Sequence, residues 1–194
     1  MNQDQVLEEF RSSGALLEGH FKLSSGLHSP VYCQCARVLM DPKRAERICG
    51  ALADRIKAAS VEIDLVVSPA MGGVIVGYEM ARQLGVPGVF TERVEGEFAL
   101  RRGFEIPQGA KILMMEDIIT TGLSSRECIK VIRAWGGDVV AAGCLIDRSN
   151  GAADVGAPVY SLVAMDAPTY AADALPDTLK AIPAIKPGSR GLKS

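Results

Sequence analysis

Residues 112–124 carry the clearest structural signal in the chain. They are Ile112-Leu113-Met114-Met115-Glu116-Asp117-Ile118-Ile119-Thr120-Thr121-Gly122-Leu123-Ser124. The four apolar residues at the start follow Gly109-Ala110-Lys111 and are typical of a buried strand in a parallel sheet. Two acids and a loop come next, and the amphipathic run from Ser125 to Trp135 predicts a helix. This order predicts a ligand site, because ligands of open α/β sheets bind outside the carboxyl ends of the strands.

The loop and the acids favour different parts of one ligand. A loop at a helix start offers backbone N–H groups to a phosphate, and the hydroxyls of Thr120, Thr121 and Ser124 add donors. Carboxylates cannot bind that phosphate, but they bind sugar hydroxyls or Mg²⁺, directly or through water. Together these groups predict a phosphorylated sugar as ligand. The alternative is an ordinary strand–turn–helix whose Ser and Thr are helix caps.

The segment resembles the 5-phosphoribosyl-1-pyrophosphate (PRPP) signature of type I phosphoribosyltransferases. That signature is an apolar strand, two acids, two spacer residues and Thr-Thr-Gly or Thr-Ala-Gly, followed by a small hydroxyl residue. The resemblance implies an α/β fold, with a parallel sheet flanked by helices and a small N-terminal hood. It implies Mg²⁺ carried by PRPP, with Glu116 and Asp117 as candidates to hold the ion through water. The implied PRPP contacts are Glu116, Asp117, Ile118, Ile119, Thr120, Thr121, Gly122, Leu123 and Ser124.

Composition bounds the class of protein. With 194 residues, 48% hydrophobic residues and a net charge of −2, we expect one domain with an ample core and no nucleic-acid surface. We expect no membrane span, no signal peptide and a cytoplasmic location. Cys33-Gln34-Cys35 is not a zinc spacing, so we expect the five cysteines to be small buried side chains in a reducing compartment.

A second strand–loop–helix unit lies earlier in the chain. The apolar run Ile63–Val67 predicts a buried strand, and Val74–Leu84 predicts a helix. The loop between them resembles the family's pyrophosphate-binding loop, which makes Met71, Gly72 and Gly73 candidate PRPP contacts. The alternative is a tight turn that needs glycine.

An N-terminal hairpin is predicted between Leu16 and Tyr32. Its Phe21–Pro30 pattern resembles the hood of one branch of the family, the orotate phosphoribosyltransferases. The resemblance implies that Ser24 contacts PRPP and that Ser25 and Gly26 contact orotate. Many members of the branch have Lys where this chain has Ser24. The alternative is an ordinary polar hairpin turn.

The stretch from Glu92 to Phe104 resembles, by position, the family's flexible catalytic loop. Arg93 matches the arginine at the start of that loop, and Arg101 and Arg102 are candidates to replace its missing lysines and histidine. In the family this loop commonly acts across a dimer interface, which implies a homodimer. The alternative is a solvated hairpin with paired charges.

Arg148 follows the predicted strand Val139–Ile146 and would face the same crevice as the acids. In the family this arginine binds the orotate ring together with the first Thr of the central loop, here Thr120. A surface pair between Arg148 and Asp147 is the alternative.

The resemblance covers nearly the whole chain. It predicts a core over about 41–165, and a hood from about 1–40 joined by a C-terminal tail, Leu175–Arg190, with a short helix. It implies an orotate phosphoribosyltransferase that uses PRPP and Mg²⁺, with Glu116, Asp117, Arg93, Arg101 and Arg102 as the catalytic candidates. Transfer to another base, such as a purine, and a non-catalytic PRPP-sensing regulator are the alternatives.

Overall fold

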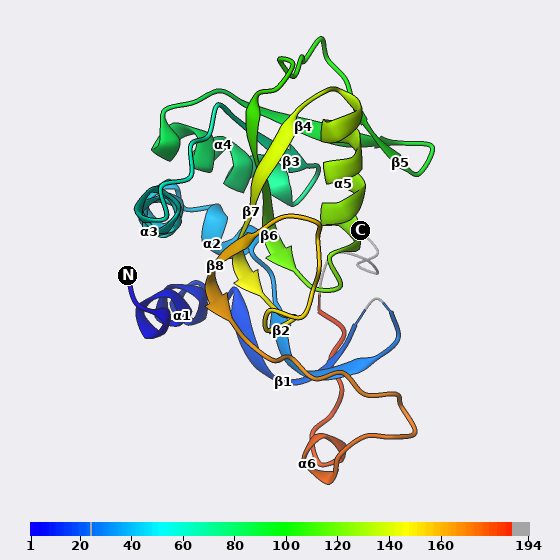
Figure 1. Cartoon of the computed structure of the whole chain (residues 1–194). Coiled ribbons are helices and arrows are strands. Elements are labelled where there is room, and N and C mark those ends of the chain that lie inside the picture. The colour runs from blue at the N-terminus through cyan, green and yellow to red at the C-terminus, as the bar shows by residue number, and fades with distance from the viewer. Residues whose placement is uncertain (24, 188–194) are drawn as a thin grey trace.

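Two sheets organise residues 1–23 and 25–187, which the computed structural model describes. The larger sheet has the order β5-β4-β3-β6-β7-β8 (Figure 1). Its strands are β3 (Leu65–Pro69), β4 (Gly88–Val94), β5 (Glu97–Leu100), β6 (Lys111–Ile119), β7 (Asp138–Asp147) and β8 (Val159–Ala164). Neighbouring strands are parallel, except that β5 pairs antiparallel with β4. The predicted parallel sheet is confirmed, and an antiparallel edge strand lies where the sequence predicted a loop.

Helices cover both faces of this sheet. One face is covered by α1 (Gln3–Ser12), α2 (Ala36–Leu39), α3 (Pro42–Ala58) and α4 (Gly73–Leu84), and the other by α5 (Leu123–Ala134). The short helix α6 (Asp177–Lys180) lies away from this sheet (Figure 1). Because strand side chains alternate, Leu113 and Met115 pack in one cluster with α1, α3 and α4, while Ile112 and Met114 pack with α5. This two-sided burial explains the continuous apolar run of β6.

Local sequence sets the start of α3. Asp41 caps α3 by accepting hydrogen bonds from the amides of Lys43 and Arg44, and Pro42 fills the first helical position. The apolar face of this helix, from Ala45 to Ile56, is buried. Within the described ranges, no helix has both the length and the apolar character that crossing a membrane requires.

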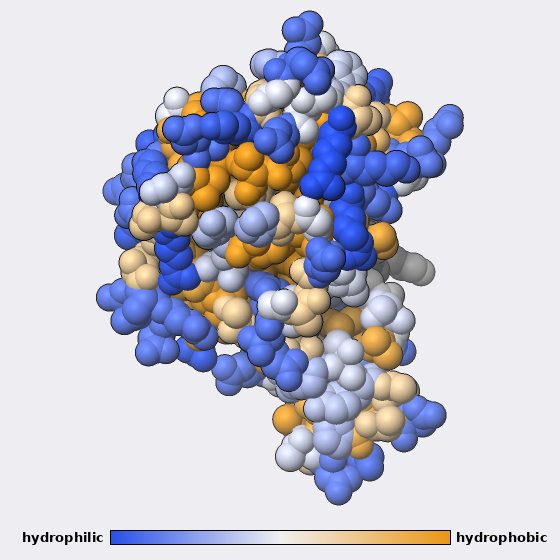
Figure 2. All heavy atoms as spheres, viewed as in Figure 1, coloured by the Kyte–Doolittle hydropathy of each residue, from blue (hydrophilic) through white to orange (hydrophobic). Residues whose placement is uncertain are grey.

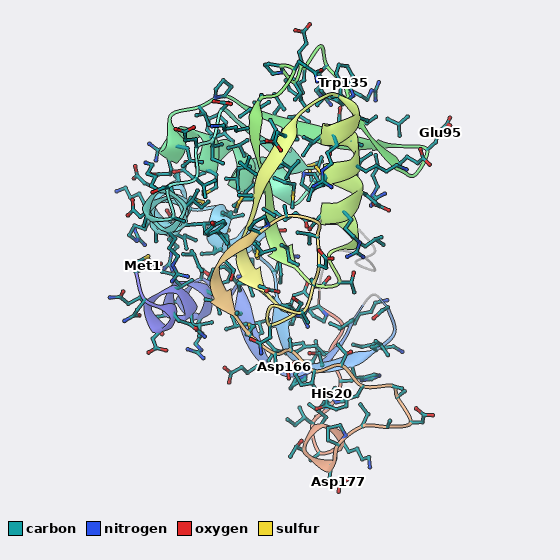
Figure 3. All side chains as sticks on the ribbon, viewed as in Figure 1. Met1, His20, Glu95, Trp135, Asp166 and Asp177 are labelled. Atoms are coloured by element: carbon teal, nitrogen blue, oxygen red, sulfur yellow. The ribbon has the colours of Figure 1, made fainter. Side chains whose placement is uncertain are left out.

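The smaller sheet is an antiparallel hairpin of β1 (Leu16–Lys22) and β2 (His28–Cys33). Residues far along the chain flank it: Ile185 forms a bridge with Phe21 of β1, and Tyr170 forms one with His28 of β2. The rings of His20 and His28 share a hydrogen bond of 2.6 Å, and His20 Nδ1 lies 2.8 Å from the carbonyl oxygen of Ile182 (His20 is labelled in Figure 3). The hairpin is therefore tied to the C-terminal segment. In Figure 1 it lies beyond the carboxyl ends of β6 and β7.

Candidate active site

The acidic pair lies on β6, which continues to Ile119 instead of ending before the acids. Successive side chains of a strand point to opposite faces, and the contacts of the two acids agree. Glu116 accepts a hydrogen bond from Ser125 Oγ at the start of α5. On the other face, a Cβ placed on Gly72 would lie 3.2 Å from both carboxylate oxygens of Asp117. One acid therefore faces the loop before α5, and the other faces the loop before α4.

Burial makes both acids harder to ionise. It raises the pKa of Glu116 to about 7, with a smaller contribution from the charge of Asp117, while the Ser125 hydroxyl opposes the rise. Burial also raises the pKa of Asp117, against the hydrogen bond that its Oδ1 accepts from the Ile118 amide at 2.9 Å. The charge of the pair therefore changes within reach of neutral pH.

A pocket of about 190 Å³ lies at the start of α5. Its lining includes most of the predicted PRPP contacts of the central motif: Glu116, Ile118, Thr120, Thr121, Gly122, Leu123 and Ser124. Gly122 has a φ of 72° and precedes α5, and a Cβ there would lie 2.9 Å from Val155 Cγ1. Ile119 does not line this pocket, because its side chain is buried in the core.

The predicted pyrophosphate loop joins β3 to α4. The Ala70 amide donates to Thr91 O at 2.8 Å, and the Ala70–Met71 peptide bond is cis. Met71 is exposed, while Gly73 is buried against the end of β6, where a Cβ would lie 3.2 Å from Met115 O. Together with the contact between Gly72 and Asp117, these distances place the loop directly beside the acidic pair.

Arg148 follows β7, and its amide donates to Ile119 O at 2.8 Å, next to Thr120. Asp147 does not pair with Arg148. It accepts hydrogen bonds from the amide and hydroxyl of Ser149 and from the amide of Gly151. The buried Nε of Arg148 has no hydrogen-bond partner among residues 1–23 and 25–187. A buried donor without a partner costs free energy, so this guanidinium is suited to a ligand oxygen.

Two arginines of the predicted catalytic loop, Arg93 and Arg102, are held in ion pairs outside the acidic pair. Arg93 contacts Glu127 of α5 at 2.5 Å, and its guanidinium lies 4.1 Å from the centroid of the Phe98 ring. Arg102 makes a bidentate pair with Glu92, at 2.7 and 2.8 Å. Arg101 is exposed. The segment forms the β4–β5 hairpin, and Figure 3 shows Glu95 at its projecting tip. In this structure the segment is therefore arranged as the alternative describes, a solvated hairpin with paired charges.

The hood contributes the exposed turn of the β1–β2 hairpin. The Gly26 amide donates to Leu23 O at 3.0 Å, and the Leu27 amide donates to Ser25 Oγ at 3.4 Å. Two of the four predicted orotate contacts, Ser25 and Gly26, are exposed at this turn. The predicted PRPP contact Ser24 lies outside the described residues.

Two residues at the site were missed in the sequence. Ser125 is fully buried and donates to Glu116, and the Sγ of Cys35 lies 3.7 Å from Asp117 O. The position of Ser125 in the first turn of the predicted helix was the only signal for its contact. No sequence pattern links Cys35 to a strand that begins 76 residues later.

The oxygen atoms of the site are suited to a magnesium ion that is held partly by the protein and partly by the phosphates of a bound substrate. Carboxylate oxygens are suitable ligands for Mg²⁺, which usually keeps several waters and binds substrate phosphates. No group of three or more His, Cys, Asp or Glu in the described part of the chain could hold a metal ion. Glu116 and Asp117 could contribute to the coordination shell, directly or through water.

Comparison with known proteins gives the class. A model of the phosphoribosyl transferase domain matches residues 36–172. The fold is similar to the crystal structure of orotate phosphoribosyltransferase from Aeropyrum pernix, with a TM-score of 0.65, 26% identity, and coverage of 82% of this chain and 93% of that one. An adenine phosphoribosyltransferase from Thermoanaerobacter pseudethanolicus shares the fold at 18% identity, with a TM-score of 0.56 and coverage of 70% and 88%. The chain therefore contains a phosphoribosyltransferase domain and has its fold.

Sequence relatives narrow the assignment. The chain is 58% identical over 193 residues to an orotate phosphoribosyltransferase of Caulobacter vibrioides, with 100% of both chains covered. It is 60% identical to the orotate phosphoribosyltransferase of Phenylobacterium zucineum, again over 100% of both. The chain therefore belongs to the orotate phosphoribosyltransferase family.

Proposed function

We propose that the chain transfers the 5-phosphoribosyl group of PRPP to orotate, which gives orotidine 5′-phosphate and pyrophosphate. The observation that carries the proposal is the pair of loops on the adjacent strands β3 and β6, with one acid facing each. PRPP has a phosphate at one end, a pyrophosphate at the other and ribose hydroxyls between them. The site has the same order: the loop before α5 for the phosphate, the two acids for the ribose hydroxyls, and the loop before α4 for the pyrophosphate.

The reaction needs charge stabilisation more than a nucleophile. The bond from the anomeric carbon to pyrophosphate breaks, the bond to the orotate nitrogen forms, and positive charge builds on the ribose ring between these events. Thr120–Ser124 hold the 5′-phosphate, and ionised Glu116 and Asp117 hold the ribose hydroxyls near the developing charge. The backbone of Gly72 and Gly73 holds the pyrophosphate. Mg²⁺, when bound, offsets pyrophosphate charge.

Arg148 is the residue that we assign to orotate. Orotate carries a carboxylate and ring oxygens, and a planar guanidinium can bind two such oxygens at once. The buried and unpartnered Nε supports this role. In Arg148→Lys, we expect the KM for orotate to rise about 10- to 100-fold, because the bidentate geometry is lost, while the Kd for PRPP stays the same. An equal loss of affinity for both substrates would contradict the assignment.

We also propose that the enzyme is a homodimer whose β4–β5 hairpin completes the site of the partner subunit. The loop before α4 and the exposed face of that helix carry Met71, Ile75 and Tyr78, whose side chains are 83%, 50% and 71% exposed. Figure 2 shows hydrophobic surface among the hydrophilic surface over α4 and the adjoining sheet. A second copy would cover these side chains. The loop arginines would then leave their acidic partners to reach pyrophosphate.

Two measurements test the dimer. Sedimentation should give twice the chain mass. A mixture of two inactive variants, Asp117→Ala and Arg101→Ala, should regain part of the activity, because mixed dimers hold one intact site. Full turnover in Arg93→Ala, Arg101→Ala and Arg102→Ala separately would refute the role of the hairpin.

The test of the reaction is consumption of orotate, followed by its ultraviolet absorbance, with PRPP and Mg²⁺. Loss of absorbance that needs both PRPP and metal is the expected result, and Asp117→Ala should abolish most of it. Consumption of adenine or guanine instead of orotate would show that the enzyme is specific for a purine base. PRPP binding without turnover of any base would favour a PRPP sensor.

A further inference from the structure

Cys33 and Cys35 form a pair of thiols next to the acidic pair. Their sulfur atoms are 3.8 Å apart, which places the two groups in contact. Cys33 ends β2 and is partly exposed, whereas Cys35 precedes α2 and is 1% exposed. The other three cysteines, Cys49, Cys128 and Cys144, are buried. The pair therefore combines one thiol that solvent can reach with a second thiol directly behind it.

The buried thiol connects this pair to the site. Cys35 donates its S–H to the carbonyl oxygen of Asp117, with a distance of 3.7 Å between the sulfur and the oxygen. A change at Cys35 is thus transmitted to a residue that we place on the ribose.

We propose that Cys33 and Cys35 are a reversible oxidation site at which a disulfide weakens PRPP binding. In the first step, the sulfur of Cys33 attacks a hydroperoxide, the O–O bond breaks, and Cys33 becomes a sulfenic acid as water or an alcohol leaves. In the second step, the sulfur of Cys35 attacks that of Cys33, the S–O bond breaks, and water leaves. Two thiols are oxidised by two electrons, and one peroxide is reduced.

The geometry explains why the disulfide would disturb the site. An S–S bond is about 2.05 Å long, so the two sulfur atoms must approach each other by nearly 2 Å. Cys35 loses its proton and, with it, the hydrogen bond to Asp117 O. Cys33 is partly exposed whereas Cys35 is 1% exposed, so Cys33 is the residue that meets the oxidant first. Disulfides in reducing compartments are usually transient and regulatory.

One tryptic peptide reports the chemistry. Cleavage after Lys22 and Arg37 releases residues 23–37, which contain both of these cysteines and no other. After brief treatment with hydrogen peroxide, this peptide should resist alkylation and be about 2 Da lighter than the reduced form. The Kd for PRPP, measured by titration calorimetry, should rise about tenfold or more, the order expected when a supporting contact of a binding residue is lost. Dithiothreitol should restore both values.

Two variants and one internal control sharpen the test. Cys33→Ser should bind PRPP normally and lose the response to peroxide, whereas Cys49→Ser should respond like the original chain. Met71 is exposed in the pyrophosphate loop, but its sulfoxide is not reduced by dithiothreitol, so reversibility separates the two events. The effect on the site rests on the proposed function. Neither the peptide mass nor PRPP binding depends on orotate, so a wrong base assignment would leave this test intact.

Three results would overturn the proposal. The peptide could remain fully alkylated after oxidation, or Cys33 could proceed to an acid that dithiothreitol does not reduce. The disulfide could also form while the Kd for PRPP stays within twofold of the reduced value.

Discussion

Replacing Glu116 with Gln should remove a cost that the buried carboxylate imposes on the fold at neutral and alkaline pH. Burial raises the pKa of Glu116 from its ordinary value of 4.5 to about 7. A difference of that size between the folded and unfolded states is worth about 3 kcal/mol. Gln keeps the shape and the ability to accept the Ser125 hydrogen bond, but it does not ionise.

The direction in which the free energy of unfolding changes with pH follows from the raised pKa of Glu116. Below pH 4.5 the carboxyl group is neutral in both states, so it imposes no cost. As the pH rises from 4.5 to about 7, the unfolded chain releases this proton while the folded chain retains it, and the free energy of unfolding falls. Above about pH 7 both states are ionised, and the loss is complete.

Urea unfolding of both proteins at pH 5, 6, 7 and 8 measures the effect. From pH 5 to pH 8, the free energy of unfolding of Glu116→Gln should rise relative to that of the original chain by about 2–3 kcal/mol. Comparing the two proteins at each pH cancels the other titrating groups. Glu8→Gln, at an exposed position of α1, is the control and should show no such trend. A difference that stays flat, or that falls with pH, would refute the assigned burial and charge of Glu116.

Three further substitutions test other contacts of the site. Ser125→Ala removes the donor that favours ionised Glu116, so the acidic limb of the pH profile of kcat/KM should move up by about 1 pH unit; an unchanged limb would contradict this. Gly122→Ala should lower the free energy of unfolding by about 1–2 kcal/mol, because a φ of 72° strains alanine, and equal stability in urea would disprove it. Glu127→Gln frees Arg93 from an exposed ion pair, so the KM for PRPP should fall by up to about fivefold, with Glu97→Gln as the matched control; a rise in KM would show that the pair supports binding.

The sequence predicted those parts of the fold that local chemistry determines. The continuous apolar run of β6 is required by helices on both faces of the sheet. The residues of the 190 Å³ pocket also lie close together in sequence, so the site before α5 was predictable.

Contacts between distant segments were not predictable in the same way. Strand β5 was missed because the charged Glu92–Phe104 segment resembles a loop, and its pairing with β4 is set by the hairpin and by packing against α5. The contacts of Arg93 with Glu127 and of Cys35 with Asp117 join residues that no periodicity relates. The sequence did not show that Glu116 and Asp117 face different loops. That difference arises because β6 continues past both acids, so that their side chains lie on opposite faces of the strand.

The bridges from Tyr170 and Ile185 to the β1–β2 hairpin affect the order in which parts of the chain can fold during synthesis. The hairpin is synthesised before the strands of the large sheet, whereas its flanking partners are synthesised after them. The hood can therefore reach its final form only when residues up to 185 are available, and until then the backbone edges of β1 and β2 have no partners. During synthesis the core can fold before the hood over the site is complete. The chain therefore becomes able to bind its substrates only late in synthesis.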